Sequence, residues 1–274
     1  KKKVKKNKKL KKINIMFISE QICFVEFGKT GCSFIREIFN ENIKSGRLTK
    51  IHDQITNDLI ASERIKVGSI RNPLDWYISL WSFGCLMKKK DPLYSNLTTL
   101  RLNPKRLKDV EDNILKKIFF LYDQFRKDIN LNENLYSDPY NIDNFKNWIR
   151  NLFDLKKRNF IGEQYSISNT NNFLGYMSFH YLIRFTNPLF HKKLFNGSMK
   201  SIMDINEYYK KYNYIYYFIK FESLSSSLIN LFERIKLPLN KNDLNNTKPI
   251  NKSNRFSKID DYYDKETTEM VKHY

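Results

Sequence analysis

Two segments of this chain share the same order of parts: a β-prone apolar run, a tight turn and a stretch of helical period. In the first segment, residues 13–27 hold two short β-prone runs around Ser19-Glu20-Gln21. The later of these runs, over 22–27, is followed by the turn GKTG at 28–31, and apolar residues recur at helical spacing from residue 33. In the second segment the run covers residues 65–70, and the turn at 71–73 leads into another helical pattern. Strands that alternate with helices are typical of an α/β fold, so we predict a parallel sheet flanked by helices.

The rest of the chain continues this alternation without a linker. Helical patterns cover 113–129, 141–155, 171–186 and 223–236, a strand is predicted over 214–221, polar loops over 88–110 and 240–258, and a last helix from near Ile259. Only 8 Gly and 7 Pro occur in 274 residues, and no Gly/Ser/Pro-rich stretch separates two parts. We therefore predict one domain over 13–274, preceded by a basic flexible tail over 1–12.

The net charge of +20 says less about binding partners than its size suggests. Nine of these charges are lysines among the first twelve residues, and abundant Lys, Asn, Ile and Tyr are typical of an AT-rich coding sequence. A non-enzymatic, basic nucleic-acid-binding protein is an alternative that rests on charge alone. We expect no specific nucleic-acid partner.

The cysteines and the hydropathy pattern indicate in which cellular compartment the protein is expected. Cys23, Cys32 and Cys85 form no CxxC pair and no Cys/His cluster with the spacing of metal ligands, so neither disulfides nor a structural metal are expected. No run of about 20 apolar residues is present for a transmembrane segment. These features predict a soluble, cytoplasmic protein. Because the sequence starts at Lys1 rather than Met, the Golgi lumen is the alternative if an upstream membrane anchor was removed.

The Gly-Lys-Thr-Gly turn predicts a P-loop-like strand-loop-helix nucleotide site. Backbone N–H groups and the positive end of the helix would converge there on an anion, and Lys29 adds a mobile charge. A Walker A loop that ends at 28–30 needs a glycine at 23, where this chain has Cys23. A P-loop kinase that uses Mg-ATP is therefore the less favoured alternative. The same tetrapeptide can equally be a tight connection that binds nothing.

The second segment carries two polar residues at a suggestive spacing. Arg71 leaves the end of the predicted strand, and Ser79 follows two helical turns later, about 12 Å along the helix. A guanidinium and a hydroxyl so placed can hold opposite sides of one phosphate. Taken alone, Arg71 would be a capping or surface residue and Ser79 a small packing residue.

Together the two segments resemble the PAPS-dependent sulfotransferases, in particular the carbohydrate sulfotransferases of the Golgi and their bacterial relatives. Lys29-Thr30-Gly31-Cys32-Ser33 is similar to the 5′-phosphosulfate loop of that family, and Arg71-Asn72-Pro73 with Ser79 is similar to its 3′-phosphate motif. Residues 219–224 resemble a further family strand, and Lys252-Ser253 with residues 262–264 resemble the C-terminal segment that closes over the nucleotide.

The resemblance covers both ends of the chain in the correct order and leaves about residues 88–210 unmatched. Trp76 stands where many members have a second basic residue, and the sequence ends at Tyr274, sooner than many members do. Both departures concern details of nucleotide binding rather than the class of enzyme.

Membership would imply transfer of a sulfuryl group from PAPS to a hydroxyl or amine of an acceptor, without a metal. Lys29 and N–H groups of Thr30, Gly31, Cys32 and Ser33 would stabilise the charge that grows on the leaving phosphate. Arg71, Ser79, Lys252 and Ser253 would hold the nucleotide. Cys32 would be a small loop residue rather than a nucleophile, because in-line transfer needs no covalent intermediate. A carbohydrate is the first expectation for the acceptor.

Members of the family use a His or Glu base near the transferred group. His52 lies between the two motifs at the end of an apparent strand, and Asp53 could orient or assist it. The alternative is a surface histidine ahead of a helix near 54–61. His180 falls on a predicted helix and is expected to pack or to line an acceptor groove.

Overall fold

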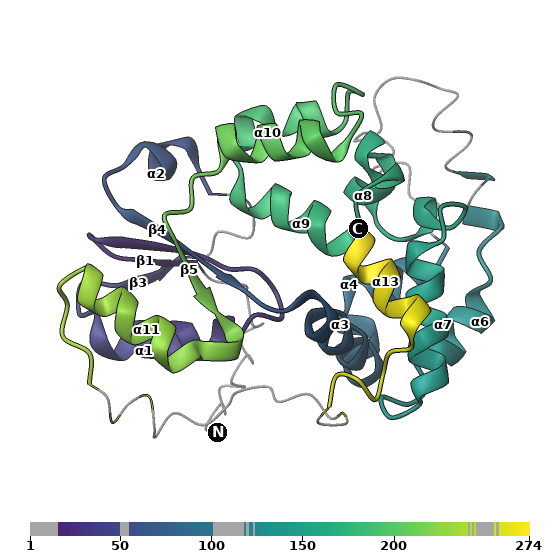
Figure 1. The fold of residues 1–274 in the computed structure, drawn as a ribbon, viewed down its shortest axis with the longest axis horizontal. Helices are drawn as coiled ribbons and strands as arrows, with labels where there is room; N and C mark the ends of the chain where they lie inside the picture. The colour runs from purple at the N-terminus through teal and green to yellow at the C-terminus, as the bar shows by residue number, and fades with distance from the viewer. Residues whose placement is uncertain are drawn as a thin grey trace, which may run out of the picture.

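The computed structural model describes residues 16–49, 55–100, 118, 121–122, 124–240, 242, 244, 255 and 258–274 (Figure 1). Its five-stranded sheet has the order β3-β1-β2-β4-β5. The strands are β1 (Met16–Ile18), β2 (Ile22–Val25), β3 (Arg47–Thr49), β4 (Ile65–Ile70) and β5 (Tyr217–Lys220). The pairs β2–β4 and β4–β5 are parallel, whereas β1 is antiparallel to both β2 and β3. The predicted α/β class is confirmed, and the prediction of a purely parallel sheet is wrong at β1.

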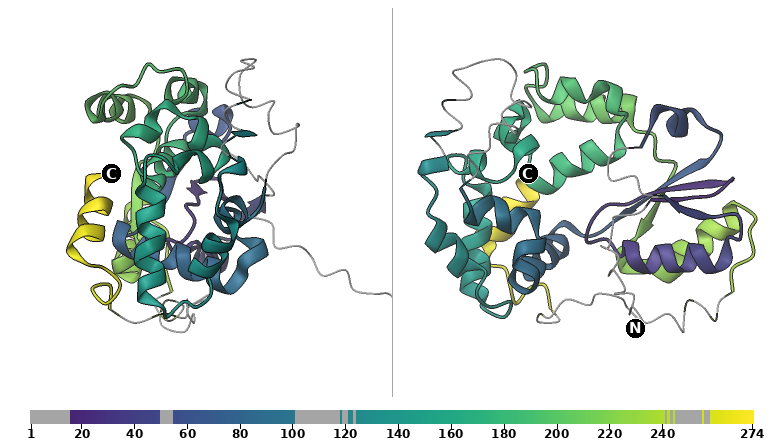
Figure 2. Two further views of the ribbon diagram at one scale, coloured as in Figure 1. Left: turned by 90° about the vertical axis from the view of Figure 1, so that its right-hand side faces the viewer. Right: turned by 180° about the vertical axis from the view of Figure 1, so that it is seen from behind.

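Helices pack against the sheet and also form a part of the molecule beyond it (Figure 1). They are α1 (Cys32–Asn42), α2 (Asn57–Ala61), α3 (Pro73–Met87), α4 (Pro92–Thr98), α6 (Ile129–Leu135), α7 (Ile142–Phe153), α8 (Glu163–Ile167), α9 (Tyr176–Phe185), α10 (Ile202–Tyr212), α11 (Leu224–Arg234) and α13 (Lys265–His273). In Figures 1 and 2, α1 and α11 lie with the sheet at one end of the molecule, and α3, α7 and α13 lie at the other.

The alternation of side chains along the central strand accounts for this layering. All four residues of β2 are buried, as expected of a strand that is covered on both faces. Phe24 packs in a cluster with Ile38 and Phe39 of α1, whereas Cys23 and Val25 belong to a larger cluster with α3 and α9. The sheet therefore separates two cores, and the larger one extends into the helical part of the chain.

Several predicted boundaries need correction. The loop predicted over 88–110 is wrong for its described part, because a 3-10 turn at Lys88–Lys90 leads into α4, which Asp91 caps and Pro92 starts. The helix predicted over 171–186 is broken before α9 by Gly175, which serves as its N-cap. The last helix starts at Lys265 rather than near Ile259, because Asp264 and Thr267 form a capping box.

Helix α10 was not predicted, although a capping box of Ser201 and Asp204 marks its start. The predicted basic tail over 1–12 and most of the 240–258 loop lie outside the described residues, as do residues 113–117, 119, 120 and 123 of the helix predicted over 113–129. Among the residues that the structure describes, no helix is both long enough and apolar enough to cross a membrane.

Candidate functional site

The two turns singled out by the sequence meet at one edge of the sheet. Because β2 and β4 are parallel neighbours, the loop after β2 and the turn after β4 emerge side by side at their carboxyl ends, where open α/β sheets commonly bind ligands. Arg71 Nη1 donates a hydrogen bond to the Lys29 carbonyl at 2.9 Å, and Trp76 Nε1 donates to the Gly28 carbonyl at 2.7 Å. The loop after β2 is thus fixed to the start of α3.

The shape of this loop depends on its backbone dihedral angles. Lys29 and Gly31 both have positive φ, at 70° and 81°, a region that side chains other than glycine adopt at a cost. Thr30, between them, is fully buried, and its hydroxyl donates to the Phe27 carbonyl at 2.5 Å while Ser69 Oγ lies 2.6 Å away. The Thr30 side chain therefore anchors the loop to the ends of β2 and β4.

The loop leads directly into the N-terminus of α1. Gly31 is the N-cap and provides no side-chain capping bond, and the first N–H groups of an α-helix make no intrahelical hydrogen bond. A Cβ built on Gly28, which is exposed, would meet nothing within 4 Å. Free space in front of the backbone and a positive helix end are two features that anion-binding turns share.

Neither Cys32 nor Ser33 has the features of a nucleophile. Cys32 Sγ donates to the Phe27 carbonyl at 2.9 Å, and burial raises the pKa of this thiol above its ordinary value. Because a thiolate is the reactive form, a raised pKa keeps Cys32 unreactive. The Ser33 hydroxyl accepts a hydrogen bond from Arg36 Nη2 at 3.3 Å. Both residues occupy the first turn of α1.

The ammonium group of Lys29 lies against α3. Its Nζ is 3.1 Å from the centroid of the Phe83 ring, a cation–π contact. Burial lowers the pKa of Lys29 to about 8, the positive charge of Arg71 acts in the same direction, and the carboxylate of Asp91 opposes them. With a pKa near 8, Lys29 is mostly protonated at neutral pH.

Arg71 is buried, yet part of its hydrogen-bonding capacity remains. It is 7% exposed; Nε and Nη2 contact Asp75 Oδ2 at 2.6 and 2.5 Å, and the guanidinium carbon lies 3.9 Å above the Phe221 ring. Burial lowers the pKa of Arg71, and the Asp75 carboxylate opposes this effect. A guanidinium has five N–H groups. With Nε bonded to Asp75 and Nη1 bonded to the Lys29 carbonyl, the Nη groups still hold donors for a further ligand.

Ser79 shares a face of α3 with these groups. It lies one helical turn after Asp75 and one turn before Phe83, and residues four apart are neighbours on a helix surface. Ser79 is 8% exposed. The structure thus joins Lys29 and Arg71 at one edge of the sheet and places Ser79 further along α3, so the predicted role of Ser79 in a phosphate site stays a prediction.

Three predicted site residues cannot be placed. His52, Lys252 and Ser253 lie outside the described residues, as does Asp53, so their assignments stay predictions. His180 lies in α9 in edge contact with Tyr176, at 4.2 Å between ring centroids. Burial lowers its pKa to about 4, with a further contribution from Arg184, so the ring is neutral at physiological pH.

The C-terminal part of the chain also reaches this edge. Arg255 Nη1 forms an ion pair with Asp75 Oδ1, and the Tyr263 hydroxyl donates to the Leu74 carbonyl at 2.9 Å. Glu222, after β5, accepts a hydrogen bond from the Asn72 backbone N–H at 2.5 Å. Sequence reasoning missed these contacts. Asp75 has a usable signal, its i,i+4 spacing from Arg71, whereas Arg255 has none, because 180 residues separate it from Asp75.

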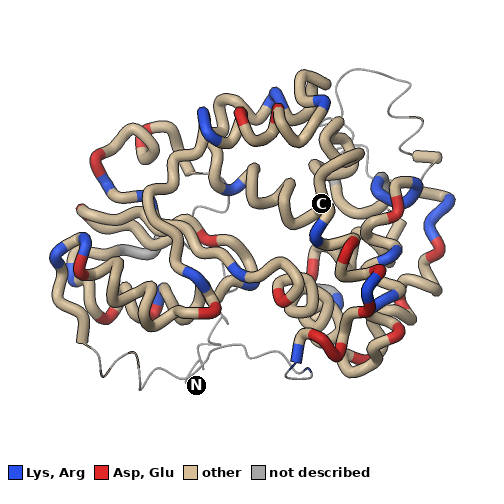
Figure 3. Tube along the Cα trace, in the orientation of Figure 1, with Lys and Arg blue, Asp and Glu red and all other residues tan. Residues whose placement is uncertain are grey.

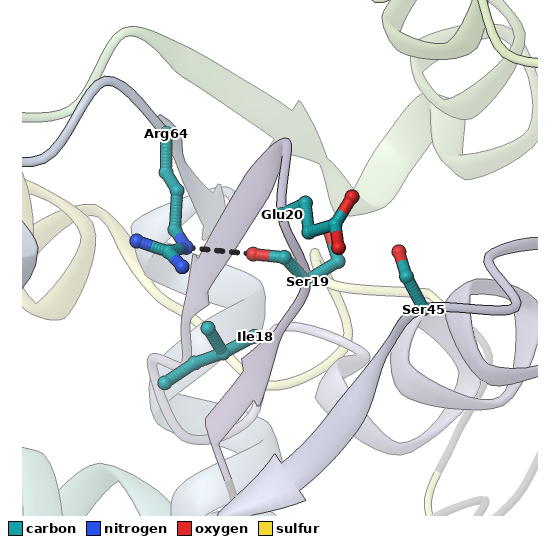
Figure 4. A pocket seen from close by; sticks show the side chains of 5 residues that line it. All are labelled: Ile18, Ser19, Glu20, Ser45 and Arg64. Carbon is teal, nitrogen blue, oxygen red and sulfur yellow. Dashed lines mark hydrogen bonds between the residues drawn. The ribbon is translucent and has the colours of Figure 1, made fainter.

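A separate cavity of about 200 Å³ lies at the opposite end of the strands (Figure 4). Ile18, Ser19, Glu20, Ser45 and Arg64 line it, and Arg64 Nε donates to the Ser19 carbonyl at 2.7 Å. Ser19 and Glu20 precede β2, so this cavity is at the amino end of that strand. None of the predicted site residues that the structure describes lines it.

No protein-family model matches the sequence, and no curated protein or solved structure is significantly similar to it. The site therefore has to be interpreted from its own geometry.

Proposed function

We propose that this chain is a sulfotransferase that moves a sulfuryl group from PAPS to a hydroxyl or amine of an acceptor, with a carbohydrate as the first candidate, and releases PAP. The observation that carries the proposal is the hydrogen bond from Arg71 to the Lys29 carbonyl. It joins the two segments that resemble the 5′-phosphosulfate and 3′-phosphate motifs of that family. Two phosphate motifs in contact at one sheet edge are more specific than either motif alone.

The loop after β2 fits the 5′ end of the nucleotide. Gly28 leaves room in front of the backbone, and α1 starts without a side-chain cap. The Lys29 ammonium and the N–H groups of 30–33 would face the negative charge that grows on the leaving phosphate as the S–O bond breaks. Such preplaced donors stabilise the transition state more than the ground state.

The start of α3 fits the 3′-phosphate. Arg71 retains donors after binding Asp75 and the Lys29 carbonyl, and Ser79 lies on the same face of the helix. A buried donor that is left unpaired costs free energy, so a nucleotide without the 3′-phosphate should bind more weakly than one that carries it. Lys252 and Ser253 are proposed to contact the nucleotide from the C-terminal segment, whose described part already contacts α3 through Arg255 and Tyr263.

The acceptor must lose a proton when its oxygen or nitrogen bonds to sulfur. We propose His52 as the base that takes this proton, with Asp53 orienting or assisting it. A neutral imidazole can accept one proton and release it to solvent after PAP leaves.

Among the residues that the structure describes, the charge distribution gives little support to the nucleic-acid alternative. Blue and red segments are interspersed over both halves of the molecule in Figure 3, whereas a nucleic-acid-binding surface gathers basic residues along one stripe. Cys23, which occupies the place of the Walker glycine, is buried inside β2, and this disfavours the Mg-ATP kinase.

Calorimetry with PAP, Mg-ATP and duplex DNA in parallel tests these three functions. We expect PAP to bind in the presence of a chelator and to raise the melting temperature, since it binds only the folded site. Binding of Mg-ATP without binding of PAP would favour the kinase. Binding of DNA alone, with a steep dependence on salt, would favour the nucleic-acid function.

A further inference from the structure

Trp76 holds the loop after β2 through both its ring and its N–H group. It is 4% exposed, and its indole ring stacks on Phe27 with 5.5 Å between ring centroids and 4° between the planes. Its Nε1 donates a hydrogen bond to the carbonyl of the next residue, Gly28, at 2.7 Å. Trp76 also departs from the sulfotransferase pattern, in which many members have a second basic residue here. At this place the chain therefore has a clamp on the loop instead of a charge.

The carbonyl groups at the start of this loop are all bound by side chains. Those of Phe27, Gly28 and Lys29 accept hydrogen bonds at 2.5, 2.7 and 2.9 Å. Carbonyl oxygens repel an anion, whereas backbone N–H groups attract it. Because these three oxygens are turned toward protein donors, they are kept away from an anion that approaches the loop.

The peptide between Gly28 and Lys29 presents its N–H group on the side away from Trp76. The C=O and N–H bonds of a trans peptide point in opposite directions, and no cis peptide bond occurs among the described residues. Within the described ranges, the N–H of Lys29 has no hydrogen-bond partner. It adjoins Gly28, where a Cβ would meet nothing within 4 Å. An unpaired donor next to open space suits an oxyanion.

The conformation of Lys29 needs a contact that maintains it. Its φ is 70°, which is unfavourable for a residue with a Cβ. Rotation of the Gly28–Lys29 peptide by about 180° would change ψ of Gly28 and φ of Lys29 together, and φ would return to the favoured negative range. Glycine at position 28 tolerates either orientation. The hydrogen bond from Trp76 opposes this rotation, because the rotation would leave its buried N–H unpaired.

We propose that Trp76 is a positioning residue, whose indole N–H holds the Gly28–Lys29 peptide so that the N–H of Lys29 faces the leaving 5′-phosphate of PAPS. The role in sulfuryl transfer rests on the proposed function, whereas the orientation of the peptide does not. A rotated peptide would place the Gly28 carbonyl beside the negative charge that grows as the S–O bond breaks, and this would oppose the reaction.

Trp76→Phe tests this role, because phenylalanine keeps an aromatic ring against Phe27 and lacks the N–H donor. We expect the NMR signals of the Lys29 amide and Cα, which report its φ, to move toward those of an extended residue. PAP affinity, measured by calorimetry, should fall about two- to tenfold, the contribution of one hydrogen bond between neutral groups. Unchanged Lys29 signals in this variant would overturn the inference.

Trp81→Phe is the matched control from the same helix. Trp81 is fully buried, and its Nε1 donates to the Leu135 carbonyl at 2.9 Å, so the variant loses the same kind of ring and the same kind of hydrogen bond. Both variants should have a lower free energy of unfolding in urea, but Trp81→Phe should leave the Lys29 signals and PAP affinity unchanged. If both variants reduce PAP affinity equally, the cause is a general loss of stability, and Trp76 has no positioning role.

Inorganic pyrophosphate separates this inference from the proposed function, because it has the oxyanion without the nucleoside. Weaker binding of pyrophosphate to Trp76→Phe, with no binding of PAP to wild type, would support the clamp and would mean that the sulfotransferase function is wrong. Equal PAP affinity in wild type and Trp76→Phe would leave the function standing, and the positioning role would fail. If wild type binds neither anion, the loop is not an anion site, and the inference fails together with the function.

Discussion

The turns after β2 and β4 lie side by side, yet they are held together in opposite ways. The turn after β2 is shaped by its backbone, with two residues at positive φ and one buried threonine as anchor. The turn after β4 is shaped by side chains: Asn72 caps α3, Pro73 starts it, and Arg71 pairs with Asp75. The turn after β2 offers N–H groups and the side chain of Lys29, which few contacts hold. The turn after β4 offers the guanidinium of Arg71, which several contacts fix.

This difference suggests a division of labour within the proposed site. A rigid, buried guanidinium suits a group that stays bound throughout the reaction, such as a 3′-phosphate. A lysine side chain held by few contacts can follow the leaving 5′-phosphate, whose negative charge grows during transfer. Substitutions in the two turns should therefore affect different quantities, catalysis in the first and nucleotide discrimination in the second.

The largest effect is expected at Lys29. Lys29→Ala should slow the release of PAP from PAPS, assayed with a panel of oligosaccharide acceptors, by about 10²–10³-fold. Its effect on PAP affinity should be much smaller, because its charge acts mainly on the developing leaving-group anion. Lys44→Ala, in the exposed turn that follows α1, is the control and should be neutral. Near-normal turnover in a folded Lys29→Ala protein would remove Lys29 from the mechanism.

A smaller and more selective effect is expected at Arg71. Wild type should bind PAP much more tightly than AMP, and Arg71→Ala should reduce this preference by about tenfold to a few hundredfold, since a charge-assisted hydrogen bond contributes roughly 1.5–3 kcal/mol. Asp75 keeps Arg255 as an ionic partner in this variant, so no buried charge is left alone. Calorimetry with both nucleotides measures the preference.

Ser79→Ala sharpens the result for Arg71. Arg71 also holds the Lys29 carbonyl, so its loss can loosen the neighbouring loop. Ser79→Ala should reduce the preference for PAP over AMP as Arg71→Ala does, but by a smaller factor. If Arg71→Ala weakens PAP and AMP equally, the guanidinium supports the loop or the 5′ end, and the 3′-phosphate assignment is wrong.

The two turns also differ in how far the sequence predicts them. Strands β2 and β4 and helices α1 and α3 follow from local periodicity and from Pro73, so their order and type are predictable. The antiparallel direction of β1 follows from the short connection at Ser19–Gln21, a hairpin signal that the prediction did not use. Helix α4 has a start signal in Asp91-Pro92 that a polar composition concealed.

The contacts that complete the site are harder to predict. Lys29, Arg71 and Ser79 stand out because each belongs to a short motif. The rings of Phe83 and Phe221, which contact Lys29 and Arg71, and the guanidinium of Arg255, which pairs with Asp75, reach the site through the packing of the whole chain. No local pattern marks a residue for a contact that the tertiary fold alone creates.

The smallest expected effect concerns the backbone of the loop after β2. Gly31 has φ of 81°, and a Cβ there would lie 3.2 Å from the Phe221 ring. Gly31→Ala should therefore lower the free energy of unfolding by about 1–2 kcal/mol, the cost of a left-handed conformation for an L-residue. Urea denaturation with and without PAP measures this change.

Gly28→Ala is the matched comparison within the same loop, because a Cβ there would touch nothing within 4 Å and Gly28 is not among the residues with positive φ. Its free energy of unfolding should stay within about 0.5 kcal/mol of wild type, the range of ordinary surface substitutions. The added methyl group would instead occupy the space in front of the loop, so PAP affinity should fall while stability does not. Unchanged PAP affinity in Gly28→Ala would show that the nucleotide does not approach this turn, and the 5′ end of the proposed site would have to lie elsewhere.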